Sequence, residues 1–576
     1  MTEYVKFILK ITRLTTKLSQ NIIPCLGNTT KFERKFLMAA KSLILVESAN
    51  KAKTLKKLCG GSYSVLSTEG FLKAMPKSRL AIDEQNNYAA DYKTVRGQGP
   101  TLQMLKKKTA DAGRIFIATN PNAEGEFLAN QYCGLFGINE ESRCRVICEE
   151  FTKTAVKAAL QNARPVDMKI VDAYQAKQIV DKIASHKIGE YFSYKIWRGN
   201  KVGRFRAMLL KIISESQPAG TFEIEKNLTA ATLQELAARD LNFSATKTRL
   251  IAAQLYEGIN FDKEGYSGLI TFPGGKISLT SEKRTPDSVK DFLNDNEFKL
   301  YQLIYAAVTE NFSNKIELDG ACTNLSLMFA LDNLKIDWAD YFSVGISSLI
   351  KRQYVAVENS AYKVTELGKQ ILSALEGFFD EDFSAEAYNN FNLQVQKIAE
   401  GTAEKIPVIE SYCAKFNKNF EKAMASLPEG AQVKEIPVIE TEEICDKCGH
   451  KMLLKHGRYG NYLACSNYPE CKNIKPYVER VAQICPKCGS HLNKRIFSGG
   501  RNLYICGNSA CDFSTWDEPL EKPCKNCGST MFLHKFKGRS PMIYCGNENC
   551  QTRLNHPINK ILAESKEKSK SKKNKG

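Results

Sequence analysis

Twelve cysteines near the C-terminal end constrain this chain more than any other feature of its sequence. They form three quartets, each with a Cys-x2-Cys pair followed by a looser pair, and the quartets recur about 40 residues apart. Four thiolates in two close pairs are the ligand set of a tetrahedral Zn²⁺. The recurrence favours metal over disulfides and predicts three zinc ribbons. The predicted ligands are Cys445, Cys448, Cys465 and Cys471; Cys485, Cys488, Cys506 and Cys511; and Cys524, Cys527, Cys545 and Cys550.

A zinc ion held by four cysteines has no open coordination position, so these sites are expected to fold the ribbons and to perform no chemistry. Clustered Cys-x2-Cys pairs also favour a reducing compartment. The formal net charge is +19, which three loaded sites lower to about +13. A chain this basic favours polyanionic partners, nucleic acid first. No apolar run reaches the roughly 18 residues that a membrane span needs.

The rest of the sequence divides into two regions that differ in the spacing of their apolar residues. Apolar runs alternate with helical patterns at first, which predicts a small α/β domain with a largely parallel sheet. A mainly helical region with short strands follows and suits winged-helix-like modules. The expected fold class is therefore multidomain α/β plus mainly α, ending in three zinc ribbons. The predicted boundaries are an extension at 1–40, the α/β domain at 41–155, the helical core at 156–435, ribbons at 441–478, 481–518 and 520–556, and a basic disordered tail at 557–576.

The first 37 residues lack the apolar core and cleavage site of a signal peptide. Their composition favours a ragged N-terminal extension over an organellar presequence. The expected location is the cytoplasm, in association with the nucleoid. The expected state is a monomer.

Two motifs carry a resemblance to a known family. The segments "LILVESANKAKTL" at 43–55 and "ATNPNAEGEFLA" at 118–129 resemble the Toprim domain of type IA DNA topoisomerases. Later segments, among them "VGRFRAMLLKIISE" and "GLITFP", follow in family order, and the ribbons are similar to the C-terminal zinc modules of bacterial members. The resemblance implies an acidic cluster that holds Mg²⁺, a tyrosine that attacks the DNA phosphodiester and an arginine that stabilises the developing charge.

Carried over by position, the Toprim motifs of this chain keep some family residues and lose others. Glu47, Lys51 and Glu124 match the family glutamate, lysine and first glutamate of its EGE motif. Where the family reads DPDREGE, this chain reads NPNAEGE, so Asn120 and Asn122 replace the two metal-binding aspartates. An amide is a weaker ligand for Mg²⁺ than a carboxylate, so the resemblance implies a doubtful Mg²⁺ site.

The second departure removes the reactive group. The family's GLITYPRTDS is GLITFPGGKI here, so Phe272 stands in place of the nucleophilic tyrosine, Gly274 in place of the arginine and Lys276 in place of the aspartate. Phenylalanine has no oxygen with which to form a covalent link to DNA. The family's HEAIRPT segment has no counterpart. The two long insertions that form the family's arch are also reduced, to about a dozen and about twenty residues, which predicts that the arch is largely missing.

Cations and aromatics supply the candidate nucleic-acid contacts. In the helical core these are Arg204, Arg206 and Lys177. Within the ribbons, cations interleave with aromatics, a combination that stacks single-stranded bases and tracks phosphates. The ribbon candidates are Arg458, Tyr459, Tyr462, Tyr468, Arg501, Tyr504 and Tyr544. For any one of these aromatics, packing in the core of a small domain is the alternative.

Three interpretations of the whole chain remain open. The favoured one is a degenerate family member that binds DNA, single-stranded in preference, without cutting it, with RNA as an alternative ligand. A second is residual enzyme activity on DNA topology, for which Tyr266 is the nearest substitute nucleophile. A third is a zinc-ribbon scaffold in a nucleic-acid-processing complex.

Overall fold

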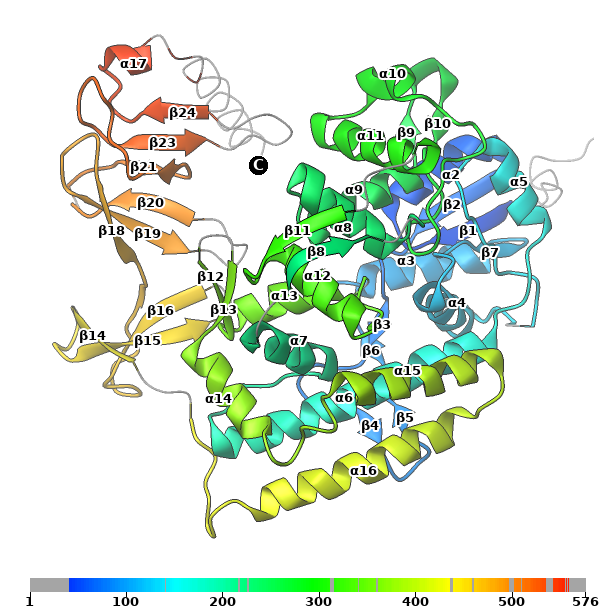
Figure 1. Ribbon diagram of the computed structural model, residues 1–576, viewed down its shortest axis with the longest axis horizontal. Helices are drawn as coiled ribbons and strands as arrows, with labels where there is room; N and C mark the ends of the chain where they lie inside the picture. Colours follow the sequence, from blue (N-terminus) through cyan, green and yellow to red (C-terminus); the bar gives the residue numbers. More distant parts are fainter. Residues whose placement is uncertain are drawn as a thin grey trace, which may run out of the picture.

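A computed structural model describes residues 41–558 except 140, 216–217, 225–226, 311–314, 340, 359–360, 436–438, 458–459, 497–501, 509, 535–541, 555 and 557. An N-terminal α/β domain and the zinc-ribbon strands lie at opposite ends of the molecule, with helices between them (Figure 1). In the described part of the chain, no helix is both long and apolar enough to cross a membrane.

The α/β domain is built on a parallel sheet with strand order β2-β1-β7, as the alternating pattern predicts. Its strands are β1 (Ser42–Val46), β2 (Tyr63–Ser67) and β7 (Ile115–Ile117). Helices connect and cover the strands: α2 (Ala49–Leu58), α3 (Gly99–Ala110) and α4 (Ala123–Phe136). Two short ladders lie between β2 and α3, formed by β3 (Lys73–Ala74) with β6 (Lys93–Thr94) and β4 (Ile82–Asp83) with β5 (Ala89–Ala90).

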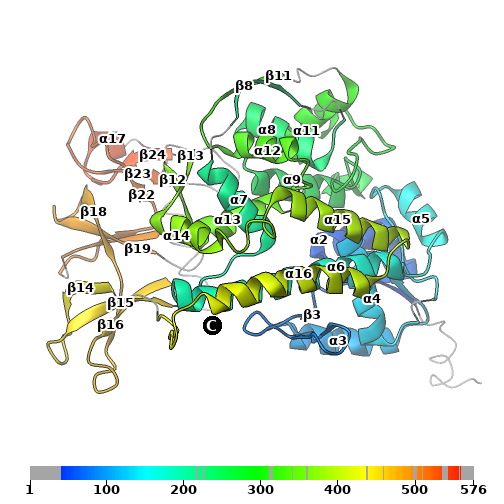
Figure 2. The same ribbon diagram turned by 60° about the horizontal axis from the view of Figure 1, so that its bottom comes forward.

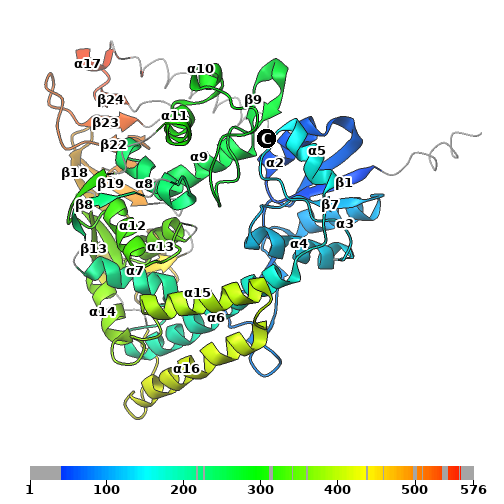
Figure 3. The same ribbon diagram turned by 45° about the vertical axis from the view of Figure 1, so that its right-hand side comes forward.

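The two faces of β1 belong to different cores. Leu43 and Leu45 pack into a core with residues of α3 and α4, whereas Ile44 and Val46 enter a core that also contains Phe272. Side chains alternate between the two faces of a strand, so a continuous apolar run is what a sheet covered on both sides requires. The second face thus joins the α/β domain to the helical core, and α9 (Ala245–Glu257) lies beside this domain in Figure 3.

The helical core contains one long helix, α6 (Met168–Lys195), against which α15 (Ala385–Glu400) and α16 (Lys405–Ala425) pack (Figure 2). A short β-hairpin, β12 (Val355–Glu358) with β13 (Ala361–Val364), follows α13 and precedes α14. The other helices are α5 (Lys153–Gln161), α7 (Arg204–Ser214), α8 (Ala230–Leu241), α9 (Ala245–Glu257), α10 (Pro286–Val289), α11 (Asp295–Thr309), α12 (Asn324–Asn333), α13 (Phe342–Lys351), α14 (Glu366–Leu375), α15 (Ala385–Glu400) and α16 (Lys405–Ala425).

The two segments that stand where the family's arch insertions are expected pair with each other. Strand β8 (Ala219–Glu223) runs antiparallel to β11 (Lys315–Asp319), with Ala219 opposite Asp319. Another short antiparallel pair, β9 (Ile259–Asn260) with β10 (Tyr266–Ser267), follows α9.

Each ribbon is an antiparallel sheet. The first contains β14 (Ile439–Ile444), β15 (Lys451–Gly457), β16 (Gly460–Cys465) and β17 (Ile474–Pro476). The second contains β18 (Glu479–Ile484), β19 (His491–Ile496), β20 (Asn502–Cys506) and β21 (Ser514–Thr515). The third contains β22 (Glu518–Pro519), β23 (Met531–His534) and β24 (Met542–Cys545), followed by helix α17 (Gln551–Leu554).

Candidate functional site

The three cysteine quartets converge as the sequence predicts, with the four sulfurs of each within 4.8 Å of one another. In the first quartet the Sγ atoms of Cys445 and Cys471 are 3.7 Å apart, and those of Cys448 and Cys465 are 3.2 Å apart. Tetrahedral coordination with Zn–S bonds of about 2.3 Å requires sulfurs about 3.8 Å apart. The quartets therefore have the dimensions of structural Zn²⁺ sites.

A glycine after each Cys-x2-Cys pair closes the turn that aims both sulfurs at one point. Gly449, Gly489 and Gly528 have φ of 74°, 75° and 69°, a left-handed conformation that glycine adopts without steric cost. The amide of Gly449 donates to the Cys445 carbonyl at 2.9 Å, and the other two knuckles repeat this bond.

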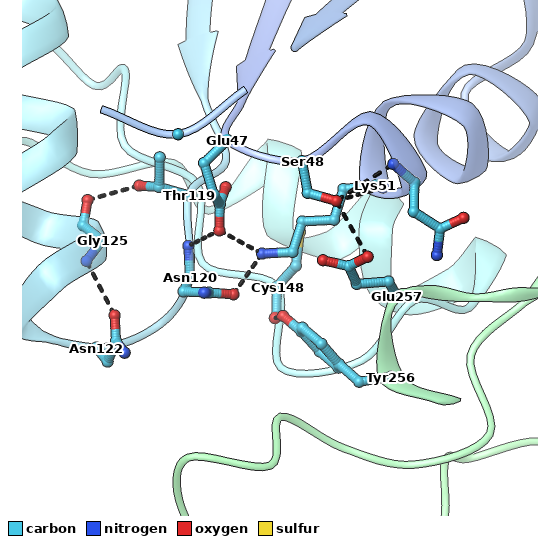
Figure 4. Close-up of polar contacts among 12 residues, drawn as sticks. Glu47, Ser48, Lys51, Thr119, Asn120, Asn122, Gly125, Cys148, Tyr256 and Glu257 are labelled. Carbon is cyan, nitrogen blue, oxygen red and sulfur yellow. Dashed lines mark hydrogen bonds and ion pairs between the residues drawn. The ribbon is translucent and has the colours of Figure 1, made fainter. Parts of the chain in front are cut away.

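A second cluster lies at the carboxyl ends of β1 and β7, the edge at which parallel sheets place ligand sites (Figure 4). The Lys51 ammonium donates to Glu47 Oε1 at 2.6 Å and to Asn120 Oδ1. The backbone amide of Asn120 donates to the same Glu47 oxygen at 3.0 Å. Lys51 is only 1% exposed, and its ammonium lies 5.4 Å from the centre of the Tyr256 ring.

The loop after β7 is held by the first turn of α4. Asn122 caps this helix, because its Oδ1 accepts from the Gly125 amide at 2.9 Å. A Cβ on Gly125 would overlap the backbone of Asn120, so glycine is required for this close approach. Glu124 Oε2 accepts a hydrogen bond from the Tyr174 hydroxyl at 3.3 Å.

Glu126, the second glutamate of the EGE motif, is structural. Arg145 Nε donates to it at 2.9 Å, and Arg164 adds a second ion pair. Burial alone would raise the pKa of the Glu126 carboxyl, but the two arginines outweigh it and hold the pKa below its usual range. Arg145 also donates to the Asn120 carbonyl at 2.6 Å, so this network fixes the loop.

Phe272 lies against the same cluster. A cavity of about 540 Å³ is lined by Asn120, Asn122 and Glu124 from the α/β domain and by Phe272 and Gly274 from the helical core. The Phe272 ring is 9% exposed and packs edge-on against Tyr256, with ring centres 5.4 Å apart. A Cβ on Gly274 would overlap this ring, so the glycine lets the loop fold over it.

The comparisons with known proteins agree with this arrangement. A family model described as Toprim domain matches residues 42–150. The model described as topoisomerase DNA binding C4 zinc finger matches residues 442–479 and 482–519. The full-length topoisomerase I from Thermotoga maritima has a similar fold, with a TM-score of 0.58, 19% identity, and coverage of 75% of this chain and 97% of that chain.

The chain is topoisomerase I-like in its fold. Its N-terminal α/β domain is a Toprim domain, and its C-terminal region contains three four-cysteine zinc sites. The third quartet lies beyond the two matched stretches but repeats their geometry, with its cysteine pairs 3.9 and 3.4 Å apart.

One predicted DNA contact of this topoisomerase-like chain does not fit the structure. Arg204 is 2% exposed, and its Nε donates to Asp181 at 2.8 Å. Its guanidinium lies between the rings of Tyr388, Phe391 and Tyr412. Because these helices cover it, Arg204 does not reach a phosphate in this conformation and instead ties α7 to α6, α15 and α16.

The other two helical-core candidates differ in position. Arg206 is half-buried, and burial is the largest cause that lowers the pKa of its guanidinium. The Lys177 ammonium lies 4.2 Å from the centre of the Tyr341 ring, at the margin of the cavity that Tyr341 lines. Of the three, Lys177 therefore remains the best-placed candidate beside the cavity.

The aromatic residues of the ribbons divide into core and surface. Tyr504 and Tyr544 are 5% and 6% exposed and pack inside, so in this conformation they are core residues and present no face to a base. Tyr462 is half-buried. Tyr468 is 65% exposed, and Trp516, which the sequence interpretation missed, is 53% exposed. The remaining ribbon candidates, Arg458, Tyr459 and Arg501, lie outside the described residues.

The buried position of Phe272 makes its packing testable. We expect Phe272→Ala to lower the free energy of unfolding of the Toprim and helical regions by about 3 kcal/mol or more, because a buried ring is replaced by a cavity. Phe272→Leu, which refills most of that volume, should cost less. Denaturant titration followed by circular dichroism measures both. Equal stability of Phe272→Ala and the parent chain would show that the ring is not a core residue.

Proposed function

We propose that this chain binds single-stranded DNA and does not cleave it. The observation that carries the proposal is the position of Phe272 on the cavity wall beside Asn120 and Asn122. By resemblance the reactive phenol belongs at this point, and phenylalanine supplies no oxygen to attack a phosphodiester. The family chemistry therefore lacks its nucleophile, whereas the zinc sites keep all twelve ligands.

Two other tyrosines that line the cavity, Tyr256 and Tyr174, are poor substitutes. Tyr256 donates its hydroxyl to the Cys148 carbonyl at 2.6 Å, and burial raises the pKa of this phenol well above its usual value. Burial also raises the pKa of the Tyr174 phenol, so both remain protonated at neutral pH. Tyr266, the substitute that the sequence suggested, lies in β10 and is not among the residues that line the cavity.

The short ladder of β8 and β11 also favours binding over strand passage. These strands occupy the positions at which the family's two arch insertions are expected, and they pair directly with each other. A chain without the arch has no ring through which a second strand passes. We propose on this basis that 156–435 is a topoisomerase core that lacks most of its arch.

The ribbons supply a binding surface of the required chemistry. Tyr468 and Trp516 expose aromatic rings, and base stacking on such rings tolerates any sequence because every base has a π-face. The chain remains basic after zinc binding, which attracts the phosphates. We propose a monomer that acts in the cytoplasm at the nucleoid.

The test incubates the protein with end-labelled single-stranded DNA and divides the sample. One half is assayed for retained complex, and the other is denatured and assayed for DNA covalently attached to protein. We expect a salt-sensitive complex and no covalent adduct. An adduct with the unmodified chain would contradict the loss of cleavage, and no complex at low salt would contradict the DNA-binding role.

Restoring the phenol alone should not restore activity. We expect Phe272→Tyr to leave negatively supercoiled plasmid unrelaxed in Mg²⁺, because Gly274 supplies no cation and Asn120 and Asn122 supply no carboxylates. Each missing charge raises the barrier by about 3 kcal/mol, roughly a hundredfold in rate. Gel electrophoresis of plasmid topoisomers measures the result. Relaxation by this variant, with the parent chain as control, would contradict both the substituted site and the missing arch.

A further inference from the structure

The centre of the Toprim cleft already contains a cation, the ammonium of Lys51. It lies between Glu47 Oε1, at 2.6 Å, and Asn120 Oδ1, with the Tyr256 ring on another side (Figure 4). Burial at 1% exposure requires its charge to be matched locally, and Glu47 provides one negative charge. The pair is therefore neutral as a unit.

The oxygen atoms that would hold a divalent ion are mostly engaged by protein donors. Asn120 Oδ1 accepts from Lys51, and Glu47 Oε1 accepts from both Lys51 and the Asn120 amide. Asn122 Oδ1 accepts from the Gly125 amide. Glu47 Oε2 is buried without a hydrogen-bond partner among the described residues. Of these three residues only Glu47 offers a carboxylate, and one of its two oxygens is already engaged by Lys51. Mg²⁺ in proteins is bound through one or two carboxylates together with several waters, so this set is a poor one for the ion.

The two asparagines change the net charge of the group that contains Glu47 and Lys51. With aspartates at 120 and 122, the group formed by these residues, Glu47 and Lys51 would carry −2, the charge that one divalent cation balances. With asparagines the same group carries no net charge. Two further carboxylates line the same cavity but lie outside this group. Glu124 accepts from the neutral Tyr174 hydroxyl, and Glu257 accepts from the Ser48 hydroxyl at 3.0 Å, with burial raising the pKa of the Glu257 carboxyl.

We propose that the Lys51 ammonium takes the place of the divalent cation in this Toprim cleft, so that the cleft is complete without metal. The residues present do not fit Mg²⁺, and no reaction step passes through it. If the chain binds single-stranded DNA as proposed above, that binding is independent of Mg²⁺ at matched ionic strength. The metal measurement below uses no DNA, so it can fail or succeed separately from the DNA-binding role.

The first test uses Mn²⁺ as a spectroscopic substitute for Mg²⁺ and counts bound ions by electron paramagnetic resonance. The zinc-loaded full chain should bind no Mn²⁺ in the Toprim cleft. The Asn120→Asp/Asn122→Asp variant should gain one ion, which Glu47→Gln in the same chain then removes. One Mn²⁺ per unmodified chain that Glu47→Gln abolishes would overturn the proposal. Failure of the double variant to gain an ion would overturn the charge-balance argument.

The second test measures the lysine as the counter-ion of Glu47. Lys51→Met should lower the thermal midpoint because it leaves a buried carboxylate unmatched, and adding Glu47→Gln should recover much of that loss. Millimolar MgCl₂, compared with NaCl of equal ionic strength, should shift neither the parent midpoint nor its complex with single-stranded DNA. Additive effects of the two substitutions, or a midpoint raised by Mg²⁺ in the parent chain, would contradict the assignment.

Discussion

We expect Cys488→Ala to release one of three zinc ions and to disturb the second and third ribbons together. Structural zinc in small domains supplies about 10 to 16 kcal/mol of apparent folding free energy, so loss of a single ligand unfolds its ribbon. The second ribbon is not independent. Leu492 of β19 shares a buried cluster with Phe532 and Tyr544 of the third ribbon, and Thr530 donates to the Ile484 carbonyl at 2.7 Å.

The first ribbon supplies the matched control. Its buried cluster contains Met452 and Leu463 with its own cysteines, and among the described residues none from the other two ribbons belongs to it. Cys448→Ala should therefore also release one zinc but leave the second and third ribbons protected. Elemental analysis counts the zinc, and hydrogen exchange of the β23 and β24 amides reports on the third ribbon. Three ions retained by Cys488→Ala, or fewer than three in the parent chain, would contradict this interpretation.

The zinc sites were predictable because their determinants are local. A Cys-x2-Cys pair and the glycine after it specify one turn, and the second pair follows within the same small sheet. The parallel sheet was predictable for a similar reason, since the apolar run of β1 shows that both faces are covered. Fold class and cofactor therefore followed from short stretches of sequence.

Arg204 shows where sequence reasoning stopped. From the sequence, an arginine at the start of α7 is expected to be an exposed phosphate contact. In the structure, three rings from distant parts of the chain enclose it: Tyr388, Phe391 and Tyr412. No local pattern reports such packing. The burial of Tyr504 was hidden for a different reason. Successive side chains of a strand point to opposite faces, and which face of β20 is buried depends on the register of its pairing with β19.

Phe272 combines both situations. The sequence alone shows that position 272 carries no phenol. The burial of Phe272 and the role of Gly274 become visible only in the structure, where the Phe272 ring packs against Tyr256. The glycine stands where the resemblance expects an arginine, and a side chain there would overlap the ring. Phenylalanine at 272 and glycine at 274 therefore fit together sterically, which neither position shows by itself.

Surface aromatics of the ribbons should account for much of the affinity for single strands. We expect Tyr468→Ala combined with Trp516→Ala to weaken binding by about 25-fold or more, since each stacked base contributes about 1 to 3 kcal/mol. No charge is removed, so the slope of the logarithm of affinity against the logarithm of salt concentration should stay the same. Fluorescence anisotropy with a labelled oligonucleotide measures both quantities.

The control is Tyr504→Phe, which keeps the buried ring and removes only a hydroxyl. It should bind as the parent chain does, because a ring at 5% exposure offers no face to a base. Retention of three zinc ions by every variant excludes unfolding as the cause of a loss. Unchanged affinity of the double variant would show that these two rings are not the binding surface. The cavity beside Lys177 would then be the candidate, because the basic chain attracts phosphates without any stacking at the ribbons.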